Sequence, residues 1–295
     1  MKIARFTHAG RTRLGVVDGA EVLDVGSADD SLPTDVGDLL RAGALDAVAG
    51  LTATAGRIAL GDVRLEAPIA QPPEFLAIGL NYALHVAERK DGSPEPPAVP
   101  QVFNKQVTCI NGPYDPIEIP DAAPSRVDYE GELAVVIGAR CRAVPRERAH
   151  EVVAGYMVAN DVSVRDWQKA SATLTMGKSW DTHGPIGPWL VTADEIPDPH
   201  DLRLRTWVDG ELRQDDTTAH MINDCWALIE YISTAFTLLP GTIISTGTPA
   251  GVGVHRNPPG LLAPGMTVRV EIERIGAIEN PVVAQVRTES LARSA

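Results

Sequence analysis

Cysteine and lysine are scarce in this sequence of 295 residues. The three cysteines, Cys109, Cys141 and Cys225, lie far apart and lack the CxxC spacing of a metal or redox motif. We therefore expect buried thiols in a reducing cytoplasm and no disulfide framework. Only five lysines are present, so each one is a candidate for a specific role.

Basic clusters are missing as well. The chain has 39 acidic residues against 26 basic ones and a formal net charge of -13. Because no basic run is long enough to neutralise a row of phosphates, we expect no nucleic-acid partner. An anionic substrate would need local positive charge at its site, from a metal ion or a few basic side chains.

Long hydrophobic runs are also absent. The start of the chain, MKIARFTHAGRTRLG, lacks the apolar core of a signal peptide. The longest uncharged stretch, residues 231–254, is interrupted by proline and glycine, which a membrane-spanning helix tolerates poorly. The sequence therefore predicts a soluble, cytoplasmic protein without a membrane partner.

The pattern of short strands and turns predicts a β-rich α+β fold. Strands are expected at KIARFT, RLGVVDG and AEVLDVG, followed by a helix over residues 36–49. Three prolines in RLEAPIAQPPEF indicate an extended connection, so we divide the chain into a small N-terminal domain, 1–70, and a main domain, 71–295.

The main domain alternates apolar strands with few helices. Helical spacing joins Met221, Ile222, Cys225, Trp226, Ile229, Ile232 and Phe236, before Pro240 and Gly241 end the pattern. Residues 89–100 are rich in charge and proline and predict a surface loop, which in this position can serve as a lid.

Two carboxylates in VDYEGELAVVIG are spaced for metal binding. Glu130 and Glu132 are two apart, so a strand sends them to the same face, which Asp128 shares. Leu133–Ile137 is apolar on both faces and predicts a strand that is covered on both sides. Two carboxylates at the mouth of a buried region repel each other unless a hard cation such as Mg²⁺ or Mn²⁺ binds them. The alternative is a solvated strand surface, the usual setting of a lone ExE.

A third ligand is expected, and Asp161 is the candidate. The apolar run YMVA ends at Asn160-Asp161, which breaks into a turn before a short helix. In the alternative interpretation, Asp161 or Ser163 simply caps that helix.

Acid/base chemistry is indicated by His85 and Glu88, which are three apart in IGLNYALHVAE and so share one face of a helical turn. A carboxylate at this spacing can orient an imidazole and raise its basicity. An exposed polar pair on an amphipathic helix is the alternative.

Three further segments offer groups for an anionic substrate. Lys178 lies between small and aromatic residues, although it can equally be a surface lysine. Arg165 and Gln168 would project together to bind a carboxylate, unless Arg165 only pairs with Asp161 or Asp166. In TIISTGTPAGVG, backbone N–H groups and the Thr248 hydroxyl could meet an oxyanion, although a bare turn fits as well.

Six segments, in this order along the chain, resemble the signature of the fumarylacetoacetate hydrolase family. The resemblance covers roughly residues 75–290, and no metal-ligand position is substituted. The segments are IGLNYALHVAE, PQVFNK, DYEGELAVVIG, ANDVSVRDWQ, GKSWDTHGPIGPWL and LLPGTIISTGTPAGVG.

The resemblance implies a mixed β-roll catalytic domain, a homodimer, and Mg²⁺ or Mn²⁺ as the cofactor. It implies that Glu130, Glu132 and Asp161 bind the metal, that His85, Glu88 and Lys178 are catalytic, with the dyad on a closing lid, and that Arg165, Gln168 and Thr248 contact substrate. Phe103 and Lys105 belong to a matching motif whose role the resemblance does not assign. The N-terminal segment resembles that of bacterial members rather than the animal tyrosine-degradation enzyme, which weighs against fumarylacetoacetate as the substrate.

The function that the resemblance implies is hydrolysis of a carbon–carbon bond in a small 2,4-dioxo acid, of the acylpyruvate or fumarylpyruvate type, through a metal-stabilised enolate. A decarboxylase or enol–keto isomerase, acting on oxaloacetate or 2-hydroxyhepta-2,4-diene-1,7-dioate, would use the same enolate without a hydrolytic water. A noncatalytic metal- or ligand-binding protein is the alternative of another class, and the intact dyad beside an intact metal set argues against it.

Overall fold

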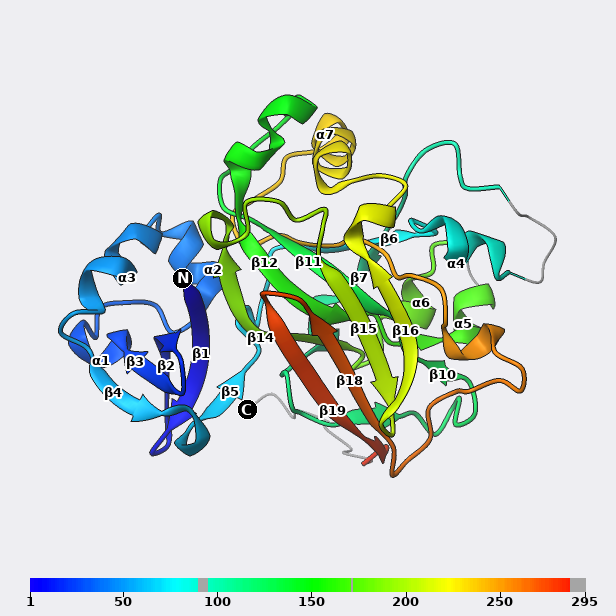
Figure 1. Ribbon diagram of the computed structural model, residues 1–295, viewed down its shortest axis with the longest axis horizontal. Helices are drawn as coiled ribbons and strands as arrows, with labels where there is room; N and C mark the ends of the chain where they lie inside the picture. Colours follow the sequence, from blue (N-terminus) through cyan, green and yellow to red (C-terminus); the bar gives the residue numbers. More distant parts are fainter. Residues whose placement is uncertain (90–94, 171, 287–295) are drawn as a thin grey trace, which may run out of the picture.

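A computed structural model describes residues 1–89, 95–170 and 172–286. These residues form a β-rich mixed α/β fold with a small N-terminal β domain beside a larger body, which confirms the predicted fold class (Figure 1). Part of the predicted loop 89–100, residues 90–94, lies outside the described residues, so its role as a lid stays a prediction. Among the described residues, every helix is too short or too polar to cross a membrane.

The central sheet runs through both parts of the chain. Its main path, in spatial order, is β4 (Gly56–Ala59), β3 (Glu21–Asp24), β2 (Arg11–Asp18), β1 (Lys2–His8), β14 (Gly184–Thr192), β12 (Val153–Asn160), β11 (Gly131–Ile137), β17 (Ile243–Ser245), β6 (Phe75–Gly79) and β7 (Gln101–Lys105). Off this path, β5 (Arg64–Glu66) pairs with β1, and β8 (Ile110–Asn111) pairs with β14.

A second sheet packs across the central one (Figure 1). Its order is β16 (Glu211–Thr217), β15 (Arg203–Val208), β18 (Thr267–Ile272), β19 (Gly276–Ala284) and β9 (Ile117–Ile119). A short pair, β10 (Val127–Asp128) and β13 (Ser163–Val164), lies beside the two sheets.

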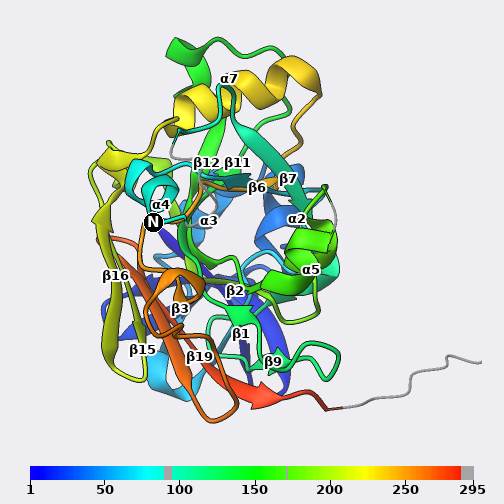
Figure 2. The same cartoon turned by 90° about the vertical axis from the view of Figure 1, so that its right-hand side faces the viewer.

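The helices are short. They are α1 (Val25–Ala28), α2 (Val36–Arg41), α3 (Leu45–Leu51), α4 (Ala83–Ala87), α5 (Arg165–Ala170), α6 (Thr175–Lys178) and α7 (Cys225–Ala235). Figures 1 and 2 show α7 at one end of the molecule, beyond the ends of β11 and β12. In Figure 2, α5 lies on the opposite side from β15 and β16.

Three predicted element boundaries were wrong. The expected helix over 36–49 is two helices, because Gly43 between α2 and α3 has a φ of +65° and breaks the helical path. The strand expected to reach Gly26 ends at Asp24, whose side chain caps α1. Helix α7 begins at Cys225, not at Met221, because the Asp224 side chain accepts the Ala227 N–H at 2.8 Å.

Strand β11 is buried on both faces, as its apolar run predicted. Leu133, Val135 and Ile137 belong to the core cluster that also contains side chains of the second sheet, and Ala134 and Val136 belong to the cluster that contains α2 and α3. The three cysteines are free and buried, as expected. The residue that precedes β11, Glu130, is therefore held at the end of a fully buried strand.

The N-terminal strands join the central sheet directly. Strand β1 pairs antiparallel with β14, Lys2 opposite Val191 and Ile3 opposite Leu190. The sheet is thus continuous across residue 70, and the division into domains 1–70 and 71–295 stays a prediction.

Candidate active site

A cavity of about 650 Å³ opens between α4, α5, α6 and the segment that follows β17. Seven of the nine predicted site residues line it: His85, Glu130, Glu132, Arg165, Gln168, Lys178 and Thr248. The other two, Glu88 and Asp161, lie behind this lining, each bonded to a residue of it. The structure therefore brings all nine candidates to one place.

Three carboxylates meet at the floor of this cavity. Oxygen atoms of Glu130, Glu132 and Asp161 lie within 4.8 Å of one another, and all three residues are buried. The pairing of β11 with β12 explains their meeting, because Gly131 lies opposite Asn160 and the Asp161 N–H donates to the Glu130 carbonyl at 2.8 Å. Residues 130 and 161 thus leave the same end of one antiparallel pair.

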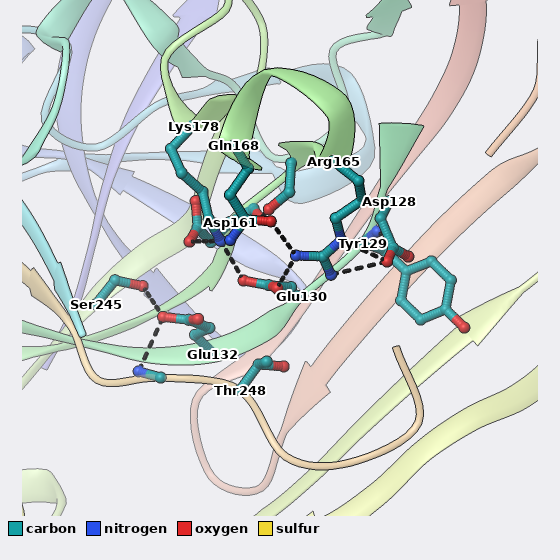
Figure 3. A network of polar contacts seen from close by, with 12 residues as sticks. Asp128, Tyr129, Glu130, Glu132, Asp161, Arg165, Gln168, Lys178, Ser245 and Thr248 are labelled. Carbon is teal, nitrogen blue, oxygen red and sulfur yellow. Dashed lines mark hydrogen bonds and ion pairs between the residues drawn. The ribbon is translucent and has the colours of Figure 1, made fainter. Parts of the chain in front are cut away.

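Two buried lysines neutralise part of this cluster (Figure 3 shows one of them, Lys178). Lys178 Nζ donates to Glu130 Oε2 at 2.5 Å and to Asp161 Oδ2 at 2.7 Å. Lys105 Nζ donates to Asp161 Oδ1 at 2.7 Å and also to the backbone carbonyl of Lys178. The Asp161 carboxylate therefore binds two cations, and the alternative that it only caps a helix is wrong.

Arg165 is held by a carboxylate that the sequence placed on the metal face. Asp128 Oδ2 accepts from Arg165 Nε at 2.8 Å and lies 2.7 Å from Nη2. Arg165 Nη1 lies 2.7 Å from Glu130 Oε1 and donates to Gln168 Oε1 at 3.0 Å. Arg165 thus links Glu130 to Gln168 (Figure 3). Among the described residues its ion pairs are with Asp128 and Glu130, and not with Asp161 or Asp166.

The charges of this network do not cancel. With every group ionised, four buried carboxylates, Asp128, Glu130, Glu132 and Asp161, meet three buried cations, Lys105, Arg165 and Lys178, which leaves one negative charge. A divalent cation would change that to one net positive charge, which suits an anionic substrate. The local field would then be opposite in sign to that of the acidic protein.

The two glutamates have opposite electrostatic environments. Burial raises the pKa of Glu130, but the charges of Lys178 and Arg165 outweigh it and hold that pKa well below its ordinary value. Burial, with repulsion from Asp161 and Glu130, raises the pKa of Glu132 well above its ordinary value. Glu132 is therefore the carboxylate that most lacks a compensating cation.

The contacts of Glu132 fit a divalent metal site. Its Oε2 accepts from the Ser245 hydroxyl at 2.6 Å and from the Gly247 N–H at 3.0 Å, both neutral donors. From the described residues we find no hydrogen bond to Oε1. The cluster offers only carboxylate oxygens, including this Oε1 atom, and no histidine or cysteine. Such a hard donor set is the kind that Mg²⁺ and Mn²⁺ prefer.

The predicted acid/base pair is formed. His85 Nδ1 lies 2.7 Å from Glu88 Oε1, and Glu88 follows the last residue of α4. The other oxygen of Glu88 accepts the Gly251 N–H at 2.9 Å. The carboxylate is therefore fixed from two sides, and it can hold Nδ1 protonated so that Nε2 is available as a base.

Several backbone N–H groups of the segment after β17 donate hydrogen bonds to carboxylates of the protein. Gly247, Gly251, and Gly253 with Val254 donate to Glu132, Glu88 and Asp128, respectively. The Thr248 hydroxyl donates to the Gly131 carbonyl at 2.9 Å and accepts from Gln214 at 2.7 Å. Thr248 lines the cavity, and its contact with substrate stays a prediction.

Sequence reasoning missed several residues of this site. Asp128 was seen only as a neighbour of the metal ligands, and Lys105 only as part of a motif. Ser245, Gln214 and His255 were not considered. The scarcity of lysine was a usable signal for Lys105, whereas Ser245 and Gln214 carry no pattern that distinguishes them from ordinary strand residues.

Comparison with known families identifies the family of this chain. The family model described as fumarylacetoacetate (FAA) hydrolase C-terminal matches residues 74–283. The chain belongs to the fumarylacetoacetate hydrolase family. A second model, described as Rv2993c-like, N-terminal, matches residues 1–68.

Relatives of this fumarylacetoacetate hydrolase family member carry several activities in their names. Oxaloacetate tautomerase fahd2, mitochondrial, of Xenopus laevis is 42% identical over 292 residues, which is 96% of this chain and 90% of the relative. Fumarylacetoacetate hydrolase from Exiguobacterium antarcticum is 38% identical, with a TM-score of 0.86 over 97% of this chain and 100% of that one.

A third relative was solved with ligands. Maleylpyruvate hydrolase from Sphingobium sp. SYK-6, in complex with manganese (II) ion and pyruvate, is 34% identical, with a TM-score of 0.79 over 97% of this chain and 100% of that one. The protein is thus an enzyme of the family, with a candidate acidic metal site, among relatives named as hydrolases and as a tautomerase.

Proposed function

We propose that this protein is a divalent-metal-dependent hydrolase that cleaves a carbon–carbon bond of a small 2,4-dioxo acid, of the acylpyruvate or fumarylpyruvate type. The observation that carries the proposal is that two different chemical devices face one cavity. One is the cluster of three carboxylates, of which Glu130 and Glu132 line the cavity, and the other is the imidazole of His85 held by Glu88.

Glu130, Glu132 and Asp161 are the residues that would hold Mg²⁺ or Mn²⁺. When bound, the cation supplies a Lewis acid for the carboxylate and 2-oxo group of the substrate. Support comes from the hard donor set of the cluster and from the related maleylpyruvate hydrolase, which was solved in complex with manganese and pyruvate.

The dyad accounts for the water that hydrolysis requires. Glu88 accepts a hydrogen bond from the Nδ1–H of His85, which leaves Nε2 available to take a proton from a water molecule while the water oxygen bonds to the distal carbonyl carbon, C4. The C4–O π pair moves onto the carbonyl oxygen. When that oxyanion collapses and re-forms the C4–O double bond, the C3–C4 bond breaks and its electron pair leaves on the pyruvate fragment as an enolate.

Two cations at the cavity would favour this departure. Lys178 uses two of its three N–H donors on Glu130 and Asp161, and it lines the cavity together with Arg165. Both would oppose the negative charge that develops on the leaving pyruvate. The products are pyruvate, after it accepts the proton from His85, and a second carboxylic acid.

Enol–keto tautomerisation is the second candidate. The relative that is 42% identical over most of this chain is named an oxaloacetate tautomerase. Such a reaction needs the same acidic site and a proton carrier but no attacking water. Decarboxylation of an oxo diacid would likewise proceed without this water.

Product analysis separates these reactions. The purified protein is incubated with Mn²⁺ or Mg²⁺ and, in turn, acetylpyruvate, fumarylpyruvate and oxaloacetate, with an EDTA-treated sample as the control. Hydrolysis releases pyruvate and a second acid, decarboxylation releases CO₂, and tautomerisation changes only the enol absorbance. Metal-dependent loss of enol absorbance without any pyruvate from either acylpyruvate would overturn the hydrolase proposal.

We also propose a cytoplasmic homodimer with two domains, 1–70 and 71–295. Light scattering of the purified protein measures the assembly directly, and a mass corresponding to one chain would refute the dimer. One relative is named as mitochondrial, so the compartment is best tested by fractionation of the native cell.

A further inference from the structure

A second imidazole faces the cavity and has no part in the chemistry above. His255 ends a short 3-10 turn, Gly253–His255, and lines the cavity with its ring half-buried. Its ring centroid lies 6.2 Å from that of His85, and the two planes are tilted by 52°. Within the described part of the chain, no hydrogen bond or ion pair to the His255 ring is found.

The backbone that carries His255 is firmly held. Just before it, Gly253 and Val254 donate to the buried Asp128 at 2.8 and 2.9 Å. Further back, the Tyr129 hydroxyl donates to the Gly251 carbonyl at 2.9 Å. The ring is therefore presented by a rigid segment, which is the requirement for a preorganised hydrogen-bond donor.

The charge state of His255 suits a neutral donor. Burial lowers its pKa, and the charged or titratable groups that act on it are Glu88, His85, Arg165 and Asp128. The ring is consequently neutral at neutral pH. A neutral imidazole carries one N–H donor and one acceptor nitrogen.

We infer that His255 is a further catalytic residue, whose ring N–H donates a hydrogen bond to the distal carbonyl oxygen, at C4, of the substrate. This inference rests on the proposed hydrolysis. As the water oxygen bonds to C4 and its proton passes to His85 Nε2, the π pair becomes a full charge on the C4 oxygen, and His255 stabilises that oxyanion without transferring a proton.

The distance between the two rings fits this division of labour. The attacking oxygen and the carbonyl oxygen belong to the same reacting carbon, so their hydrogen-bond partners must be near neighbours. With hydrogen bonds of about 2.8 Å, two imidazoles can serve two such oxygens only when their nitrogens lie within several ångströms of each other. His85 and His255 meet that condition at 6.2 Å.

The kinetic test compares two substitutions. His255→Phe keeps a ring but removes the N–H, whereas His255→Gln keeps a donor. We expect His255→Phe to lower kcat for pyruvate release from acetylpyruvate by about 10²- to 10³-fold, the cost of losing one oxyanion donor, with KM within a few-fold of wild type. His255→Gln should retain more of kcat. Wild-type kcat in His255→Phe, or a loss confined to KM, would overturn the inference.

A binding test gives a readout besides turnover. In a His85→Ala background with Mn²⁺, calorimetry measures the Kd of acetylpyruvate and of oxalate, which lacks a distal carbonyl. Adding His255→Phe should raise the Kd of acetylpyruvate by about two- to ten-fold, which corresponds to the loss of one hydrogen bond, and should leave the Kd of oxalate unchanged. Equal weakening of both ligands would indicate a structural role, and no change in either would exclude the contact.

These outcomes are separable from those that test the proposed function. If wild-type protein binds acetylpyruvate but releases no pyruvate, the hydrolase proposal fails, and with it the oxyanion role of His255, although the binding test still decides whether the ring contacts the distal carbonyl. If wild-type protein releases pyruvate and His255→Phe does so at the same rate, only the role of His255 fails.

Discussion

The backbone N–H of Gly251 donates a hydrogen bond of 2.9 Å to Oε2 of Glu88. The other oxygen of that carboxylate binds His85. The acid/base dyad therefore depends on a segment that follows β17, far from α4 in the chain. Gly251 has a φ of +107°, a conformation that other residues rarely adopt.

Gly251→Ala should damage the dyad while sparing the metal site. A Cβ at this position would lie 2.1 Å from the Arg213 carbonyl oxygen, so one of the two backbone segments must shift, which disturbs the hydrogen bond from Gly251 to Glu88. We expect a loss of stability of about 1 to 3 kcal/mol and at least a ten-fold loss of kcat. Steady-state kinetics and urea unfolding test this. As a control, Gly50→Ala, with nothing within 4 Å of its Cβ, should leave kcat unchanged.

Glu88→Gln separates orientation from binding. The amide has nearly the shape of the carboxylate, but it loses the charge that stabilises a protonated His85. We expect kcat for pyruvate release to fall by about 10²-fold or more, with KM and Mn²⁺ affinity close to wild type. Measured kcat within two-fold of wild type would show that the 2.7 Å contact between His85 and Glu88 serves no catalytic purpose.

Glu132→Gln tests the metal site through stability. In wild type, Mn²⁺ at about 100 times its Kd should stabilise the fold by about 2.7 kcal/mol. The variant should lose this increment, yet in EDTA it should be at least as stable as wild type, because repulsion from Glu130 and Asp161 is gone. Thermal unfolding with and without Mn²⁺ decides, with the exposed Glu147→Gln as control. An undiminished Mn²⁺ effect in the variant would contradict the site.

Lys178→Met removes the ammonium that joins Glu130 to Asp161. Without metal, two buried carboxylates then lose a partner, which costs about 3 to 5 kcal/mol. Mn²⁺ should restore part of that loss, since it supplies positive charge at the same carboxylates, but it should not restore kcat. Urea unfolding in EDTA and in Mn²⁺ measures both effects. Lys169→Met, at an exposed position of α5, should change neither stability value appreciably.

His183 predicts a dependence of stability on pH. Burial lowers its pKa from 6.5 to about 4, and its Nε2 donates to the Glu118 carbonyl at 2.8 Å. As pH falls below about 6.5 the unfolded chain binds a proton that the folded chain does not, so stability declines until about pH 4, by about 3 kcal/mol in total. His183→Gln should lack this part of the decline in urea unfolding across that range, whereas the exposed His220→Gln should retain it.

The strand pattern could be predicted from the sequence because its causes are local. The apolar run at Leu133–Ile137 is buried on both faces, as predicted. The ends of helices were harder to predict from the sequence, because they depend on single residues such as Gly43 and Asp224. A left-handed glycine and a capping carboxylate each override a hydrophobic period that continues past them.

The candidate metal ligands were predictable for a different reason. Glu130 and Asp161 each stand at the end of an apolar strand, and only the pairing of β11 with β12 turns two such ends into one site. The role of Asp128 could not be foreseen, because the alternation that puts it on the face of Glu130 says nothing of Arg165, which reaches it from α5. Contacts between side chains from distant segments have no characteristic spacing in the sequence, so they cannot be predicted from it.

The pairing of β1 with β14 also has a consequence for synthesis on the ribosome. Val191, the partner of Lys2, is made about 190 residues after it, which at 5 to 20 residues per second means a wait of about 10 to 40 seconds. The edge left open is short, because β5 pairs with Arg5, Phe6 and Thr7 and is made much sooner. Strand β1 thus leaves little more than Lys2 and Ile3 unpaired on this edge until β14 is made.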